Sequence, residues 1–222
     1  MQSTTSALAD ALLTLRPAED VILGRIQEIH QAVLSGSAHI RQPNFIAIDS
    51  RDLDFLFRAY DEAFFGGLYR KALEGRRLIF RLSSRMTHTG GKTTQYRLPG
   101  GEVAYEIAIA SSMLFDSFRE ADRRITACGV ECVDRLNALQ RIFEHELVHL
   151  GEQLCWGASD CSAGRFQEIA SRLFLHRAHT HNLITRRERA ADSGIHVGSL
   201  VMFTFEGRRL SSKRLGCGFG GR

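Results

Sequence analysis

The strongest constraint on the fold of this chain is the pentapeptide from His145 to His149, which lies inside the apolar stretch RIFEHELVHLGEQL. Good helix-forming residues dominate this stretch, and only Gly151 disfavours a helix, so we expect it to be helical. Because four residues make about one helical turn, the imidazoles of His145 and His149 should project from the same face. The apolar neighbours predict that this helix is buried together with its histidines.

The HExxH pattern of this helix predicts a metal site with a base beside it. Buried His and Glu side chains need partners, and a cation is the natural partner for this set. In such helices the two histidines bind the metal, and the glutamate takes a proton from metal-bound water. His145 and His149 are therefore candidate ligands, and Glu146 is the candidate general base. The predicted reaction is metal-assisted hydrolysis of a peptide bond. Histidines at this spacing can also be ordinary surface residues, but the apolar setting favours a metal site.

Composition limits the class of protein. The chain has 222 residues, 44% hydrophobic and 24% charged, which is typical of a soluble globular protein with one substantial domain. Its apolar segments are too short to span a bilayer, and its first residues lack the basic region of a secretory signal. The five cysteines show no disulfide spacing, so we expect reduced thiols and a cytoplasmic location. For Cys128 and Cys132 we expect buried thiols near the start of a helix.

Charge is distributed unevenly along the chain. From Arg165 onward there are 11 Lys and Arg residues against 4 Asp and Glu residues, whereas the preceding part has 18 against 21. A basic C-terminal part is compatible with DNA contact, and equally with a solvated charged tail.

The first third of the chain is predicted to be helical. Apolar residues recur at helical spacing from about Ser6 to Leu34, in one or two helices, and Pro17 is placed at a break or at the first turn of the second. A further helix follows in RDLDFLFRAYDEAFFGGLYRKAL, where Gly66 and Gly67 should end it.

The hydrophobic period then changes to two, which indicates strands. We expect strands over Arg77–Ser84, over the segment GGKTTQYRL and over Tyr105–Phe115, with the last two joined by a turn at Pro99. The Gly90-Gly91 pair lacks the spacing of a phosphate-binding loop. The motif helix comes next, and a second helix is expected in GRFQEIASRLFLH. A final strand pair is expected in HVGSLVMFTFEGRRL, followed by a disordered end, SSKRLGCGFGGR. The resulting fold class is α+β, with a small antiparallel-type sheet packed on helices, one of them the HExxH helix.

At this point the chain resembles the SprT-like family of zinc metallopeptidases, whose eukaryotic relatives include Spartan. The resemblance covers roughly Asp52 to His176. It rests on the order of the elements: a helix like LFRAYDEAFFGGLY, a short sheet ending in a strand like YEIAIASSMLF, the HExxH helix, and a second helix with a Phe near its start, here Phe166. The chain is most similar to a bacterial branch in which LFxH is followed by a Thr-His pair and a basic RRERA-like run.

The resemblance implies a zincin-like fold and a Zn²⁺ cofactor, with His145 and His149 as ligands and Glu146 as general base. The family's third ligand is a His four residues before the Phe of the second helix. Here that position is Ser162, a poor zinc ligand.

Three residues could replace this ligand, and Cys161 is favoured. Cys161 is adjacent to the expected position, and a thiolate binds zinc well, although a buried thiol is an equal alternative. Glu168 lies 19 residues after His149, but its helical position is expected to be exposed. His176 ends the second helix and could close the site, or it could complement the helix dipole.

The predicted organisation has three parts. Residues 1–50 form a helical extension, residues 51–182 the SprT-like metallopeptidase domain, and residues 183–222 a basic tail whose strand pair resembles the start of a truncated SH3-like barrel. The predicted function is zinc-dependent hydrolysis of protein or peptide substrates, with DNA-associated proteins as one substrate class and no membrane partner. The alternative is a catalytically impaired scaffold that binds nucleic acid or protein through its basic C-terminal part.

Overall fold

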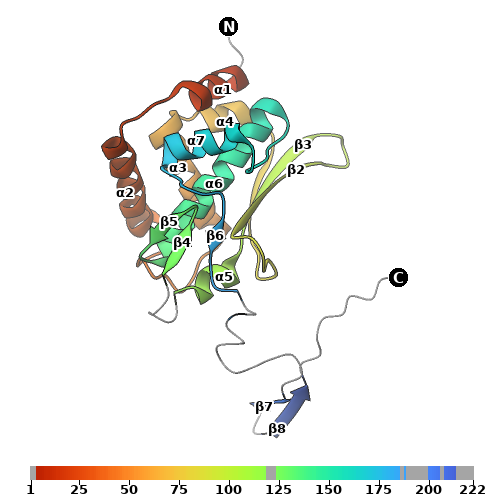
Figure 1. The fold of residues 1–222 in the computed structure, drawn as a ribbon. Helices are drawn as coiled ribbons and strands as arrows, with labels where there is room; N and C mark the ends of the chain where they lie inside the picture. The colour runs from red at the N-terminus through yellow and green to blue at the C-terminus, as the bar shows by residue number, and fades with distance from the viewer. Residues whose placement is uncertain (1–3, 119–123, 186–187, 189–199, 206–207, 214–222) are drawn as a thin grey trace.

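The computed structural model describes residues 4–118, 124–185, 188, 200–205 and 208–213 and has an α+β architecture, in which small sheets pack on helices (Figure 1). The central helix α6 contacts both three-stranded sheets and helices α1, α2, α4, α5 and α7. The helices are α1 (Thr4–Thr14), α2 (Glu19–Gly36), α3 (Ser50–Phe65), α4 (Leu68–Leu73), α5 (Ser111–Asp116), α6 (Arg135–Trp156) and α7 (Gly164–Phe174). The strands are β1 (Leu78–Leu82), β2 (Gly91–Arg97), β3 (Val103–Ile109), β4 (Ile125–Ala127), β5 (Val130–Cys132), β6 (His181–Asn182), β7 (Leu200–Phe205) and β8 (Arg208–Lys213).

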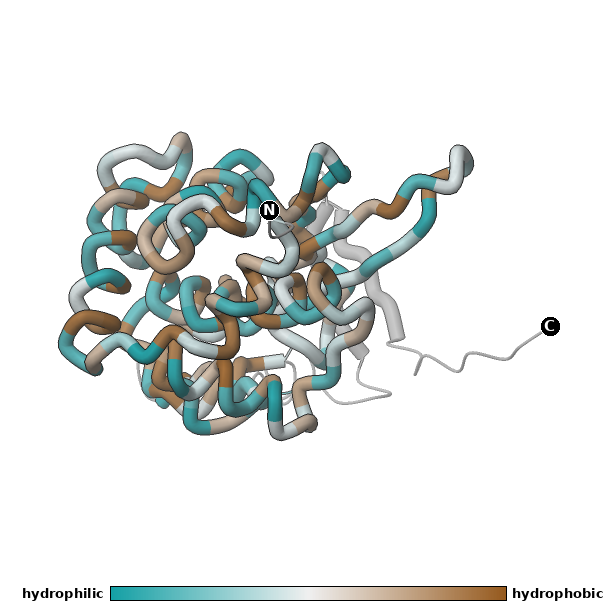
Figure 2. Tube along the Cα trace, turned by 90° about the horizontal axis from the view of Figure 1, so that it is seen from above, coloured by the Kyte–Doolittle hydropathy of each residue, from teal (hydrophilic) through white to brown (hydrophobic). Residues whose placement is uncertain are grey.

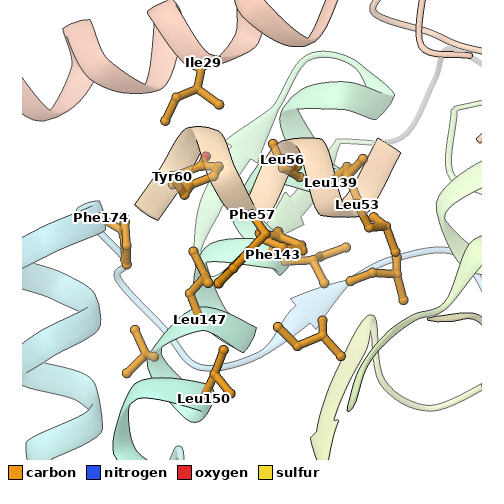
Figure 3. Close-up of a cluster of buried hydrophobic side chains, with 14 of the residues drawn as sticks. Ile29, Leu53, Leu56, Phe57, Tyr60, Leu139, Phe143, Leu147, Leu150 and Phe174 are labelled. Carbon is orange, nitrogen blue, oxygen red and sulfur yellow. The ribbon is translucent and has the colours of Figure 1, made fainter. Parts of the chain in front are cut away.

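The N-terminal helices belong to the same hydrophobic core as the rest of the molecule. Of the two placements expected for Pro17, the structure shows the break, because α1 ends at Thr14 and α2 begins at Glu19. α1 packs on α4 and α6 through its buried face, and α2 packs on α3 and α6. Figure 3 shows Ile29 of α2 beside Leu56 and Tyr60 of α3.

Helix α3 begins and ends where its sequence predicts. Asp49 caps its N-terminus by accepting hydrogen bonds from the backbone of Arg51 and Asp52, and the Asp52 side chain completes the capping box. At its C-terminus Gly66 has a φ of 56°, a left-handed conformation that glycine adopts without a steric penalty. The aromatic face of α3 packs on Phe143 of α6 and thereby fixes that helix against the core (Figure 3).

The first sheet has the strand order β1-β3-β2 and is mixed, which corrects the expected antiparallel-type sheet. β2 and β3 form an antiparallel hairpin that projects from the body (Figures 1 and 2), whereas β1 pairs with β3 in parallel. The expectation was wrong because β3 inserts between its two predecessors. The third strand is also shorter than predicted: it ends at Ile109, and α5 follows from Ser111.

A second small sheet was not predicted and positions the segment after α7. Its strand order is β5-β4-β6, and both pairings are antiparallel. The tight turn between β4 and β5 holds Cys128 at φ 53° and Gly129 at φ 71°. A Cβ at Gly129 would lie 2.9 Å from the backbone nitrogen of Ala178, so the close approach of the two segments requires glycine there.

The predicted C-terminal strand pair is confirmed as the antiparallel hairpin of β7 and β8. The disorder expected for residues 211–222 is wrong for 211–213, which belong to β8, and residues 214–222 lie outside the described part, as do 186–187 and 189–199 of the irregular basic segment. The predicted SH3-like barrel is not tested beyond this hairpin. Within the described residues, no helix is long and apolar enough to cross a membrane.

Candidate metal centre

Helix α6 carries the HExxH residues into a pocket between β2 and β6. Asp134 caps its N-terminus by accepting from the backbone N–H of Asn137 at 2.8 Å, and Gly157 ends it with a φ of 78°. The pocket has a volume of roughly 680 Å³ and is lined by His145, Glu146 and His149 together with residues 88–93 and 179–181. The predicted helix is therefore present (Figure 1), and both of its motif histidines line this one pocket.

The two motif histidines face each other through their Nε2 atoms. The distance between Nε2 of His145 and Nε2 of His149 is 3.1 Å, and the ring centroids are 4.8 Å apart. Two nitrogens bound at about 2.0–2.1 Å to one tetrahedral zinc ion lie roughly 3.3 Å apart. The observed spacing therefore fits a shared metal ion.

Both histidines are in the protonation state that a metal ligand needs. Burial, with a further contribution from neighbouring His181, lowers the pKa of His145 to about 2. Burial also lowers the pKa of His149. Both imidazoles are therefore neutral near pH 7, and each keeps one nitrogen lone pair for a cation.

Glu146 lies against β2 and has few hydrogen-bond partners. Burial raises the pKa of its carboxyl group to about 7, although Thr93 opposes this shift by donating a hydrogen bond from Oγ1 to Oε2 at 2.7 Å. A Cβ on Gly91 would lie 2.6 Å from Oε1 of Glu146, so the missing side chain at Gly91 makes room for this carboxylate. A carboxyl group with such a pKa can take up and release a proton near neutral pH.

Cys161 is the predicted third ligand that the structure brings to both histidines. Ligand atoms of His145, His149 and Cys161 all lie within 4.8 Å of one another. Cys161 is partly buried in the loop before α7, whereas neighbouring Ser162 is exposed and donates its hydroxyl hydrogen to Asp160 Oδ1 at 2.8 Å. One thiolate and two imidazoles are a donor set that suits zinc.

The two alternative ligands lie elsewhere. Glu168 is exposed and pairs with Arg16 and Arg172, with both N–O distances at 3.0 Å. His176 is buried and donates from Nε2 to Glu144 Oε2 at 2.9 Å. His176 does group with His145 and Cys128 within 4.8 Å, on the side of His145 away from His149.

Two residues of the site were missed as site residues by the sequence reasoning. His181 of β6 lines the pocket with its ring centroid 5.2 Å from that of His145, and burial lowers its pKa to about 4. Cys128 is buried as expected, but it lies in the β4–β5 turn and not near a helix start. Its Sγ is 3.9 Å from Nδ1 of His145 and 3.7 Å from Nδ1 of His181. The pairing of β4 with β6 brings these residues together, and no local sequence pattern predicts the cluster.

The described cysteines 128, 132, 155 and 161 are free thiols. Comparisons with protein-family models, curated proteins and solved structures found no match to this chain. The functional argument therefore rests on the geometry of the site.

Proposed function

We propose that this chain is a SprT-like zinc metallopeptidase with a zincin-like catalytic fold. The observation that carries this proposal is the 3.1 Å approach of the His145 and His149 Nε2 atoms, with a buried carboxyl group, Glu146, in the same pocket. The α6 helix alongside strand β2 also supports it, because this arrangement places the motif next to a sheet edge.

His145, His149 and Cys161 would hold the zinc ion. When bound in such a site, zinc acts as a Lewis acid on a carbonyl and lowers the pKa of a water ligand to about 7. Glu146 accepts the proton of the attacking water and returns it to the leaving amine, a role suited to a carboxyl group whose pKa is about 7. Thr93 holds the carboxylate in place through Oγ1.

The outer edge of β2 offers a binding surface for an extended peptide. Ala110 donates its N–H to Gly90 O, and Leu98 donates to Glu102 O, so every second residue from Gly90 bonds to β3. The backbone groups of Gly91, Thr93 and Gln95 consequently point away from β3. Those of Thr93 are already bonded to α6, the N–H to the Glu146 carboxylate and the carbonyl to Gln153 Nε2 at 3.4 Å, so the positions of Gly91 and Gln95 are the ones offered to a substrate. No described strand pairs with this edge. A substrate strand could add there by main-chain hydrogen bonds, directly beside Glu146.

The test is metal analysis and hydrolysis on the full chain. We expect about one zinc ion per chain and hydrolysis of an unfolded labelled protein that stops on chelation and returns when zinc is added. Hydrolysis that persists without metal, or a purified chain that binds no zinc, would overturn the proposal. A parallel assay with added DNA tests whether DNA-associated proteins are the substrate class. We further propose a cytoplasmic location, tested by fractionation.

A second candidate function is a scaffold that binds nucleic acid or protein through its basic C-terminal part. The observation that favours it is Ser162, which stands where the family has a histidine ligand and which donates to Asp160. A closed four-coordinate zinc site without hydrolysis would support the scaffold. DNA binding that weakens steeply with salt would identify nucleic acid as its partner.

A further inference from the structure

The side of His149 that faces away from His145 contacts a chain of polar residues. We infer that Ser159 and Glu152 are positioning residues, which fix the tautomer and orientation of His149 so that its Nε2 lone pair faces the metal. This inference rests on the proposed metal site and goes beyond it, because neither residue is a metal ligand.

The direction of each hydrogen bond follows from the chemistry of the groups. Oγ of Ser159 lies 2.6 Å from Oε2 of Glu152 and 2.6 Å from Nδ1 of His149. A carboxylate can only accept, so the single hydroxyl hydrogen of Ser159 goes to Glu152. Ser159 must then accept from His149, which places the imidazole proton on Nδ1. The Nε2 atom therefore carries the lone pair and faces Nε2 of His145.

The side chain of Glu152 is itself held at a fixed place. Its side chain is only 1% exposed, and its Oε1 accepts a hydrogen bond from Nε of Arg165 at 2.6 Å. The Arg165 guanidinium lies 4.1 Å from the ring centroid of Trp156, within the range of a cation–π interaction. This stacking restrains Arg165. Both oxygens of Glu152 are bonded, Oε1 to Arg165 and Oε2 to Ser159. Contacts thus run from Trp156 through Arg165, Glu152 and Ser159 to His149, and we call this series of contacts the relay.

The two histidines differ in how strongly they are held. On the far side of His145, Nδ1 faces the thiol of Cys128 at 3.9 Å, which is a long and weak contact. On the far side of His149, Nδ1 faces a hydroxyl at 2.6 Å that is polarised by a buried carboxylate. Partners of this kind typically contribute a factor of 10–100 to metal affinity. We therefore expect the relay to raise metal affinity through His149, which has the stronger partner of the two histidines.

Glu152→Gln tests the direction of the relay. The amide oxygen must face Arg165, which is only a donor, so the amide NH₂ would face Ser159. Ser159 would then accept from the amide and donate its own hydrogen to Nδ1 of His149. That reversal places the imidazole proton on Nε2, where it blocks the metal.

The experiment measures zinc affinity of the full chain by competition with a chromophoric chelator, together with the visible spectrum of the cobalt-substituted protein. We expect Ser159→Ala and Glu152→Gln to weaken zinc binding by about 10–100-fold. Ser159→Thr keeps the hydroxyl and should restore most of the affinity. Ser162→Ala is the matched control, because it removes an exposed hydroxyl of the same loop that donates only to Asp160. It should leave zinc affinity unchanged.

The outcomes separate this inference from the proposed function. A wild-type chain that binds no zinc overturns the proposed function. A wild-type chain that binds zinc with unchanged affinity in Ser159→Ala and Glu152→Gln overturns the relay alone. Thermal unfolding of the metal-free proteins identifies a variant that fails to fold. If Ser159→Ala does not fold, the zinc affinities of Ser159→Thr and Glu152→Gln are compared instead. Equal zinc affinities in these two variants overturn the relay.

Discussion

Two glutamates of α6, Glu144 and Glu146, are two residues apart and both buried, yet their surroundings shift their pKa values in opposite directions. Burial alone would raise the pKa of Glu144, but Arg141, His176 and Tyr60 together lower it below its ordinary value. For Glu146 burial prevails, and its pKa rises to about 7.

The difference lies in the number and charge of the donors. Glu144 accepts from Tyr60 Oη at 2.6 Å, from His176 Nε2 at 2.9 Å and from Arg141 Nη1 at 3.1 Å. Among the described residues, the Glu146 carboxylate accepts from Thr93 alone, through its neutral hydroxyl and its backbone N–H. A carboxylate with three donors, one of them a cation, is a fixed structural anion. A carboxylate whose donors are all neutral and come from one residue is suited to exchanging a proton.

The largest expected effect is the loss of hydrolysis in Glu146→Gln. Removing a general base typically costs a factor of 10²–10⁴ in rate, equivalent to about 3–5 kcal/mol, because the amide cannot accept the proton. Zinc content should stay at the wild-type level. The metal-free protein should unfold at a urea concentration no lower than that of wild type, since only neutral donors offset the burial of the carboxylate that is lost. Wild-type turnover in this variant would contradict the assigned role.

The same substitution at the neighbouring site, Glu144→Gln, should mainly reduce stability. It leaves the buried guanidinium of Arg141 without its counter-ion, and breaking a buried pair in this way costs about 3–5 kcal/mol. Urea unfolding of the metal-free protein measures the loss. A Glu144→Gln protein as stable as wild type, or a Glu146→Gln protein with the same loss, would remove the distinction between the two sites.

The contrast also explains what could be predicted from the sequence. The motif face of α6, the break at Pro17 and the helix end at Gly66 depend on local spacing or on one backbone conformation, and all three were predicted. Two partners of Glu144 could not be predicted, because Tyr60 and His176 lie 84 and 32 residues away in the chain. Cys128 and His181 are 53 residues apart and meet only through the β4–β6 pairing. Such tertiary contacts override local patterns.

Gly91→Ala should reduce hydrolysis and lower stability by about 1–3 kcal/mol, because the added methyl group overpacks the buried Glu146 side chain. The new Cβ would lie 2.6 Å from Oε1, 2.8 Å from Cγ and 2.9 Å from Cδ of Glu146, so the whole side chain of this buried residue would have to shift. A displacement on the order of 1 Å can cost about 10²-fold in rate. The measurement is kcat at wild-type zinc content. Gly100→Ala is the control, since a Cβ there would have no neighbour within 4 Å, and it should behave as wild type.

The smallest expected effect tests whether the charge on Glu144 makes its donors important. Tyr60→Phe keeps the buried ring but removes the hydrogen bond to the carboxylate, which should cost about 1.5–3 kcal/mol of unfolding free energy. It also removes the longer bond that Tyr60 Oη accepts from Gln140 Nε2 at 3.2 Å. Tyr69→Phe is matched, because Tyr69 is equally buried and donates to the neutral carbonyl of Leu147 at 2.8 Å. Its loss should cost only about 0.5–1.5 kcal/mol. Because the rings pack in the same aromatic cluster, equal losses in urea unfolding would mean that Glu144 is stabilised no differently from a neutral acceptor. A loss in Tyr60→Phe that exceeds the loss in Tyr69→Phe by more than the about 0.5–1.5 kcal/mol of the neutral Gln140 bond would show that the ionised Glu144 carboxylate stabilises the fold.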